Sequence, residues 1–184
     1  MFRVAIGEWS LECQAEGLPS FYDSYRERAT LADEFDLDRT GRAACFVSVR
    51  RADDWPFLTV AQHYDPTPDA AFFPGALIVP ETRILFLGAG TRLLAYDLVG
   101  PKRLWEDTAD AGFWGWQRHE GAVVMSAEIE MAAWDLRGQK LWSTYVEPPW
   151  TYSVDGGMVK LDVMGSISAF DLRTGPRRMG RESG

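Results

Sequence analysis

Glu128 and Glu130 are the residues whose types and spacing come nearest to a catalytic pair. Residues two apart on a strand project from the same face, so their carboxyl groups lie several ångströms apart, as in enzymes that hydrolyse glycosidic bonds. The alternative is that both residues lie at the solvated tip of a hairpin. We keep Glu128 and Glu130 as candidate ligand-binding residues and assign no catalytic residue.

His63 is a further candidate, because a histidine can act as a general base near neutral pH. Such a base needs an acid or a nucleophile beside it, and the sequence has no G-x-S-x-G, H-E-x-x-H or Cys–His signature to supply one. The alternative is a histidine at a strand end that packs against aromatic neighbours. Whether the protein is an enzyme therefore stays open.

Neither a metal nor a cofactor is predicted. The acidic segments 33–38 and 107–110 lack the D-x-D-x-D-G spacing and the distal glutamate of a calcium loop. Cys13 and Cys45 are far apart and form no C-x-x-C motif, which is typical of buried thiols in a reducing compartment. We expect a cytoplasmic protein.

A threefold internal repeat indicates the architecture. Segments 84–98, 122–136 and 158–172 align without a gap, at spacings of 38 and 36 residues. A fixed period of this size is typical of propellers and solenoids, in which each unit buries its apolar face against the next. The alternation of apolar and acidic residues at 127–131 indicates strands.

Each unit is predicted to contain four short antiparallel strands, as a propeller blade does. In the first unit these strands are expected at about 76–79, 84–88, 92–97 and 102–106. Before residue 70, three further strands are expected at 2–12, 43–50 and 57–64. Residues 21–35 have helical spacing, and 65–74 is predicted to be a loop whose Phe72 and Phe73 pack into the core.

The end of each repeat resembles the tryptophan-docking motif A-x-D-x-x-T-G-x-x-x-W of quinoprotein-type (PQQ-like) β-propeller repeats. The copies begin at Ala95, Ala133 and Ala169 and end at Trp105, Trp142 and, in the third, Met179 in place of tryptophan. The resemblance implies that each indole packs between the alanine of its own motif and the backbone of a neighbouring blade, and it implies no quinone cofactor. The chain is also similar to a group of short bacterial proteins that share the pattern LFLGAGTRLLAYDL.

A closed propeller usually needs four to eight blades, and this chain supplies three. We therefore predict an all-β fold of three four-stranded, propeller-like antiparallel repeats with additional N-terminal strands, arranged as an open or incomplete propeller. A β-sandwich or barrel is the alternative. One domain is expected over 1–184, with cap strands in 1–70 and three repeats of about 37 residues in 75–179.

Four large aromatic residues occupy equivalent positions in the first strands of two repeats, Trp114 with Trp150 and Trp116 with Tyr152. In propellers the first strand of each blade lines the central axis, so these rings could line a cleft for a carbohydrate or a peptide turn. Core filling between the repeats is the alternative. The candidate ligand-binding set is Trp114, Trp116, Trp150, Tyr152, His63, Glu128 and Glu130.

The charge of the chain argues against nucleic acid as a partner. The formal net charge is −8, and the arginines and lysines are scattered along the sequence. No apolar run reaches 18 residues, so no membrane contact is predicted. The expected partner is an unidentified protein or small molecule, and association of copies of the chain is left open.

Two functions fit these observations. The first is a non-enzymatic, protein- or ligand-binding module, because the repeats come without a catalytic constellation. The alternative is a small hydrolase or carbohydrate-active enzyme that uses Glu128 and Glu130 beside the aromatic cleft.

Overall fold

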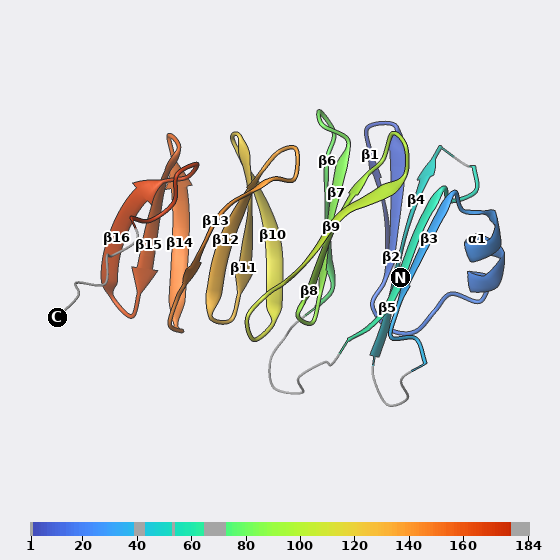
Figure 1. Cartoon of the computed structure of the whole chain (residues 1–184), viewed down its shortest axis with the longest axis horizontal. Helices are drawn as coiled ribbons and strands as arrows, with labels where there is room; N and C mark the ends of the chain where they lie inside the picture. Colours follow the sequence, from blue (N-terminus) through green and yellow to red (C-terminus); the bar gives the residue numbers. More distant parts are fainter. Residues whose placement is uncertain (1, 39–42, 53, 65–72, 178–184) are drawn as a thin grey trace.

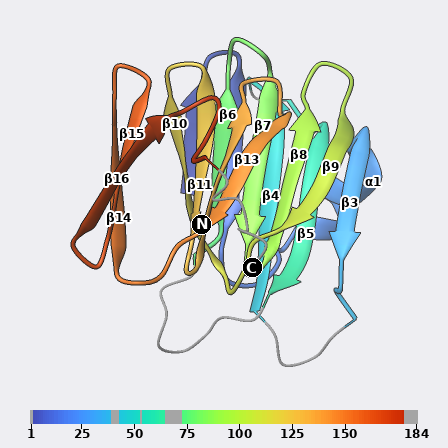
Figure 2. The same cartoon turned by 60° about the vertical axis from the view of Figure 1, so that its left-hand side comes forward.

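The computed structural model describes residues 2–38, 43–52, 54–64 and 73–177, and these form four β-sheets that stand side by side in a row (Figure 1). An N-terminal sheet lies at one end and the third repeat sheet at the other. In the view turned by 60°, β14, β15 and β16 stand apart at the left, and β3 and α1 lie at the opposite side (Figure 2). The sheets do not close on themselves, so the fold is an open, propeller-like arrangement rather than a sandwich or a barrel.

The N-terminal sheet has five strands in the order β1-β2-β4-β5-β3, with β3 parallel to β5. The strands are β1 (Phe2–Ile6), β2 (Trp9–Gln14), β3 (Leu31–Phe35), β4 (Ala43–Arg51) and β5 (Leu58–Tyr64). The prediction of three strands was wrong in number, because segment 2–12 turns back at Gly7, where φ is +62°. The stretch with helical spacing divides into α1 (Tyr22–Arg28) and strand β3.

Each repeat forms its own antiparallel sheet, as the sequence predicts. The first consists of β6 (Gly75–Val79), β7 (Ile84–Ala89), β8 (Arg92–Asp97) and β9 (Lys102–Thr108). The second consists of β10 (Phe113–His119), β11 (Ala122–Ala127), β12 (Glu130–Asp135) and β13 (Lys140–Tyr145). The third consists of β14 (Trp150–Asp155), β15 (Met158–Val163) and β16 (Ser166–Asp171), so within the described residues it has three strands rather than the predicted four.

Apolar side chains fill the three layers between the sheets. Strand β7 is buried along its whole length, because Leu85 and Leu87 face the N-terminal sheet while Ile84 and Phe86 face the second repeat sheet. The middle layer also contains Phe113 and Trp134, and the third layer contains Trp142 and Phe170. Burial of this apolar area is the main stabilising contribution to the row.

Two tryptophans lock the repeat sheets together. Trp105 lies opposite Ala95, and its Nε1 donates a hydrogen bond to the carbonyl oxygen of Gly138 in the second sheet at 2.6 Å. Trp142 lies opposite Ala133 and donates in the same way to the carbonyl of Leu172 in the third sheet at 2.7 Å. Each indole therefore satisfies its polar atom on the neighbouring sheet, as the docking motif implies.

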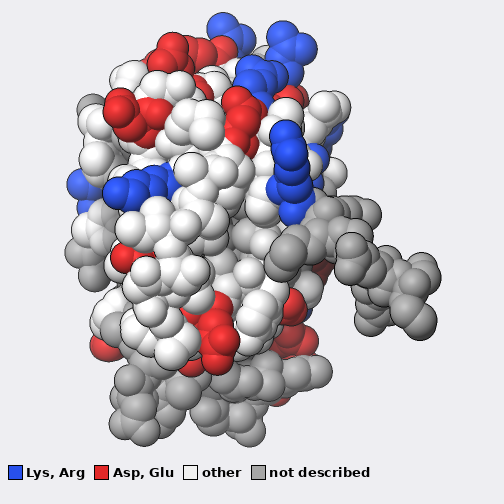
Figure 3. All heavy atoms as spheres, turned by 90° about the vertical axis from the view of Figure 1, so that its left-hand side faces the viewer, with Lys and Arg blue, Asp and Glu red and all other residues white. Residues whose placement is uncertain are grey.

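Within the described residues, the third repeat sheet ends the row with an exposed outer face that carries both polar and apolar side chains. In the second sheet, Val124 and Met131 are buried on the face toward the third sheet. Their equivalents, Lys160 and Ile167, are exposed on the outer face of the third sheet. Figure 3 shows this end, with charged side chains of both signs around an uncharged central strip.

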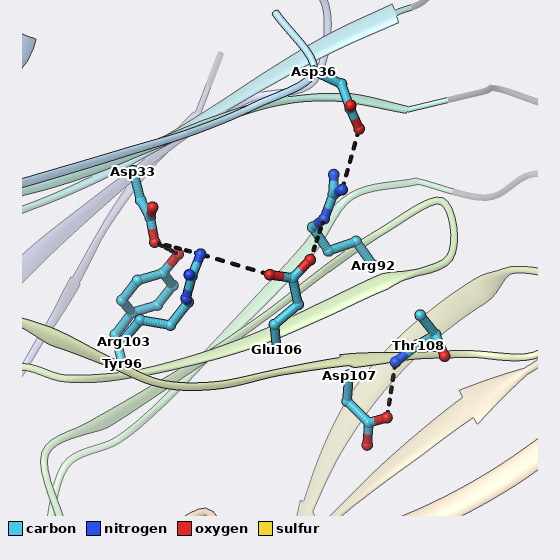
Figure 4. Close-up of polar contacts among 8 residues, drawn as sticks. All are labelled: Asp33, Asp36, Arg92, Tyr96, Arg103, Glu106, Asp107 and Thr108. Carbon is cyan, nitrogen blue, oxygen red and sulfur yellow. Dashed lines mark hydrogen bonds and ion pairs between the residues drawn. The ribbon is translucent and has the colours of Figure 1, made fainter.

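A polar network ties β3 of the N-terminal sheet to the first repeat sheet (Figure 4). Asp33 Oδ2 accepts hydrogen bonds from Tyr96 Oη at 2.9 Å and from an Arg103 nitrogen at 3.1 Å. Arg92 pairs with Asp36 at 3.1 Å and with Glu106 at 3.0 Å. These contacts fix the position of the N-terminal sheet on the repeats.

The expectation that Phe73 packs into the core was wrong, because its side chain is 66% exposed. Phe73 precedes β6, which begins at Gly75. Phe72, most of the predicted loop and Met179 lie outside the described residues.

Candidate binding site

A β-bulge in β10 directs Trp114 out of the core. The pairing of β10 with β11 shifts register between Phe113 and Gly115, so Phe113 stays buried toward the first repeat sheet while Trp114 projects toward the third. The Trp114 indole is 41% exposed and stacks on Trp150 of β14, with ring centroids 5.5 Å apart and planes at 16°. Bulges commonly re-aim one side chain in this way.

Trp150 anchors this stack. Its side chain is 7% exposed, and its Nε1 donates a hydrogen bond to the Glu128 carbonyl oxygen at 3.0 Å. On its strand, Trp150 also stacks on Tyr152, with centroids 6.2 Å apart and planes at 28°. Three nearly parallel rings therefore run from the surface into the contact between the second and third repeat sheets.

Polar side chains of β10 continue the site. Tyr152 Oη donates to Gln117 Oε1 at 2.6 Å and lies 3.4 Å from His119 Nε2. Burial raises the pKa of Tyr152 to about 12 and lowers the pKa of His119. Both side chains are therefore predominantly uncharged at pH 7, so the site offers aromatic surface and neutral hydrogen-bonding groups. We call Trp114, Gln117, His119, Trp150 and Tyr152 the Trp114 site.

Trp116, the fourth candidate ring, lies on the opposite face of β10. It packs against Phe86, Phe113 and Trp134, with centroid distances between 5.3 and 5.4 Å, in the layer toward the first repeat sheet. Residues two apart on a regular strand would share a face, but the bulge places Trp114 and Trp116 on different faces. The structure therefore brings together three of the four predicted rings.

The two glutamates have different surroundings. Glu128 lies in the β11–β12 turn, where its backbone N–H donates to the Gly112 carbonyl at 3.0 Å and its own carbonyl accepts from Trp150. Glu130 is buried, and its Oε2 accepts a hydrogen bond from the Asp110 backbone N–H at 3.0 Å. The Glu130 carboxylate thus contacts the connection between β9 and β10.

His63 lies on β5 of the N-terminal sheet, and the first and second repeat sheets stand between it and the Trp114 site. Its side chain is half-buried, and its Nδ1 is buried without a hydrogen-bond partner among the described residues. No group of three or more metal-ligating side chains occurs in the described part of the chain. No described helix is long and apolar enough to cross a membrane.

Sequence reasoning missed Gln117 and His119. Both follow from the period of two along β10, because residues 117 and 119 project to the same side as their cross-strand partners Val124 and Ala122, which pack on the third sheet. The bulge at Trp114 had no comparable sequence signal.

The chain is similar in structure to several solved proteins. No family model matches the chain, and no curated protein matches it in sequence. The computationally designed Ika4 protein is 19% identical, with 61% of this chain and 72% of that one covered and a TM-score of 0.44. BamB from Moraxella catarrhalis is 14% identical, with 78% of this chain and 50% of that one covered and a TM-score of 0.45. Saccharomyces cerevisiae Sqt1 is 12% identical, with 71% of this chain and 41% of that one covered and a TM-score of 0.45. The chain thus spans half or less of these two natural proteins.

Its own sheets define the class of this protein: an all-β protein of stacked, propeller-like repeats in an open row.

Proposed function

We propose that the protein is a non-catalytic binding module that binds a partner protein through the Trp114 site. The observation that carries the proposal is the exposed indole of Trp114 stacked on the buried indole of Trp150. A ring that is already held in place loses little conformational entropy on binding, and tryptophan is a frequent hot-spot residue of protein interfaces.

The exposure of Trp114 favours a protein over a small molecule. Small-molecule sites are concave and bury most of the ligand surface, whereas Trp114 presents its ring at the surface. Neutral donors and acceptors on Gln117 and His119 lie along the same side, and they suit the backbone amides of a peptide segment.

The same proposal extends to the repeat type and the compartment. The paired contacts of Trp105 and Trp142 with their alanines and with neighbouring carbonyls support repeats of the quinoprotein-like type within one domain. Burial raises the pKa of both Cys13 and Cys45 to about 12, so these thiols are poorly reactive. Two such free thiols are consistent with a cytoplasmic protein.

Site-specific photo-crosslinking tests this function. A benzophenone amino acid replaces Trp114 in one variant and Trp55 in another, and each variant is irradiated in an extract of the native cells. Trp55 is a matched control, because its side chain is 44% exposed and it lies on the connection between β4 and β5. We expect one protein to be crosslinked from position 114 and not from position 55.

Competition makes the result specific. An excess of wild-type protein, which lacks the benzophenone group, should abolish the crosslink from position 114. An excess of Trp114→Ala protein should not abolish it. Crosslinks that are equal at both positions, or that both competitors remove equally, would refute binding through the Trp114 site.

A further inference from the structure

Both cysteines of the chain lie in the layer between the N-terminal sheet and the first repeat sheet. Cys13 of β2 is paired with Val47 of β4, and Cys45 lies two residues before Val47 on the same strand. Val47 packs toward the first repeat sheet, and residues two apart on a strand share a face, so both thiols project into this layer. Cys13 is 8% exposed and Cys45 is 2% exposed.

The two cysteines are diagonal neighbours across β2 and β4. Diagonal positions of an antiparallel pair are about 7–8 Å apart, whereas a disulfide needs Cβ atoms about 3.5–4.5 Å apart. The two thiols are still close enough to interact, because burial is the largest cause of the raised pKa of Cys13 and the Cys45 thiol is the next. A metal ion suits such a pair better than a disulfide, since it adds a bond of about 2.3 Å to each sulfur.

Gln62 lies beside the pair, on β5 and directly opposite Cys45. Burial raises the pKa of Cys45, and hydrogen bonds from the Gln62 side chain and from the backbone of Gln62 and Cys45 oppose that rise. Gln62 is only 2% exposed, and its Oε1 has no hydrogen-bond partner among the described residues. A buried oxygen without a partner is costly, so this atom calls for a cation or a donor that the side chains around it do not supply.

One cavity of about 20 Å³ is lined by all three of these residues. A space of this size holds a single water molecule or a single ion, and it is too small for an organic ligand. Phe2, Pro74 and Leu87 also line it, and none of its described lining residues is charged. Phe2 is 57% exposed, so the cavity lies near the surface beside β1.

We propose that this cavity binds one soft metal ion of the copper(I) class between the sulfurs of Cys13 and Cys45. Thiolates select Cu(I), and two of them satisfy it, whereas a zinc site takes four ligands. Binding exchanges both thiol protons for one Cu(I), so two protons leave and the bis-thiolate complex has a net charge of −1. The hydrogen bonds to Cys45 stabilise this charge, and Gln62 Oε1 supplies a weaker third contact to the cation. This site does not depend on the Trp114 site.

Anaerobic titration of the wild-type chain with Cu(I), buffered by the chelator bicinchoninate, tests the proposal. We expect one Cu(I) per chain, with a thiolate-to-copper charge-transfer absorption that saturates at this ratio. The chain has two cysteines in all, so this absorption reports on this site alone. X-ray absorption of the copper-loaded chain should show two sulfur neighbours, and an excess of Zn²⁺ should not displace the copper.

Variants check the residues, and urea unfolding of the metal-free chains verifies that each one folds. Cys13→Ser and Cys45→Ser should each abolish the charge-transfer absorption. Gln62→Leu should weaken Cu(I) binding about tenfold, and Gln139→Leu, at an exposed position, is the matched control and should bind as the wild type does.

Three results would overturn the proposal: no Cu(I) uptake in competition with bicinchoninate, uptake that both serine variants retain, or displacement of the copper by Zn²⁺. The first would leave Gln62 Oε1 to an ordered water molecule. Should a serine variant fail to fold, the X-ray absorption of the wild-type chain decides, because copper without two sulfur neighbours contradicts the site.

Discussion

Trp142 of the second repeat sheet lies directly against Gly175 of the third. A Cβ built on Gly175 would be 2.4 Å from Cγ of the indole, and the same indole donates to the neighbouring Leu172 carbonyl at 2.7 Å. The glycine is thus required for the indole to reach its hydrogen-bond acceptor. This contact couples the position of the third sheet, and with it Trp150, to the second sheet.

Substitution of Gly175 by alanine should destabilise the protein more than substitution of Gly157. Both glycines have positive φ, +74° and +79°, so the backbone strain of about 1–2 kcal/mol is shared. Gly157 has no atom within 4 Å of a built Cβ, whereas Gly175→Ala adds an overpacking cost of about 1–3 kcal/mol against Trp142. Urea denaturation of the two variants measures the difference, and equal losses would contradict the docking contact.

Substitution of Gly88 and of Gly115 tests the packing between the first and second repeat sheets. A Cβ on Gly88 would lie 2.6 Å from the Phe113 ring, while a Cβ on Gly115 would meet nothing within 4 Å. Gly88→Ala should therefore lower the free energy of unfolding by about 1–3 kcal/mol more than Gly115→Ala. Thermal or urea unfolding that ranks Gly115→Ala as the more damaging change would show that Phe113 does not pack as described.

Removing the hydroxyl of Tyr96 should weaken the attachment of the N-terminal sheet. Tyr96 is fully buried and donates to Asp33, so Tyr96→Phe is expected to cost about 1 kcal/mol, with Asp33 still paired to Arg103. Tyr145→Phe is the control, because Tyr145 is largely exposed. Equal unfolding midpoints in urea for Tyr96→Phe and the wild type would contradict a contribution from this hydrogen bond.

His119 predicts a pH dependence of stability. Burial lowers its pKa in the folded state, so near pH 6.5 the unfolded chain binds more protons than the folded one. Its contribution to stability is therefore full above the unfolded pKa and is lost as the pH falls through 6.5 toward the lower folded value. The fall in urea midpoint between pH 7.5 and pH 5.5 should be smaller in His119→Gln than in the wild type. An unchanged pH dependence in the variant would mean that His119 is solvated.

The repeat pattern predicts most of the fold, because period-two alternation and turn residues act locally. The four strands of the first repeat lie within two residues of their predicted bounds. The N-terminal region was harder, since its β3 pairs in parallel with β5, a non-local contact that no turn announces. The exposure of the outer face of the third sheet has one signal in the sequence, because Lys160 replaces Val124 once the repeats are aligned.

The candidate site was predictable only in part. Aligned aromatic residues indicate Trp114, Trp150 and Tyr152, but a one-residue bulge decides which face each ring takes. That bulge turns Trp114 toward the third repeat sheet, while Trp116, in regular register, faces the preceding sheet as its equivalent Tyr152 does. Strand faces reverse with every shift of one residue, so register rather than composition determines the membership of the site.

The affinity of the protein crosslinked from position 114 tests the central claim most directly. Isothermal titration of that protein with wild-type, Trp114→Ala and Trp55→Ala chains compares two exposed indoles of similar exposure. The Trp114→Ala chain should unfold at an unchanged urea concentration and bind about 30-fold more weakly, as expected for a hot spot of about 2 kcal/mol, while Trp55→Ala binds as the wild type does. Equal affinity of the wild-type and Trp114→Ala chains would contradict the claim.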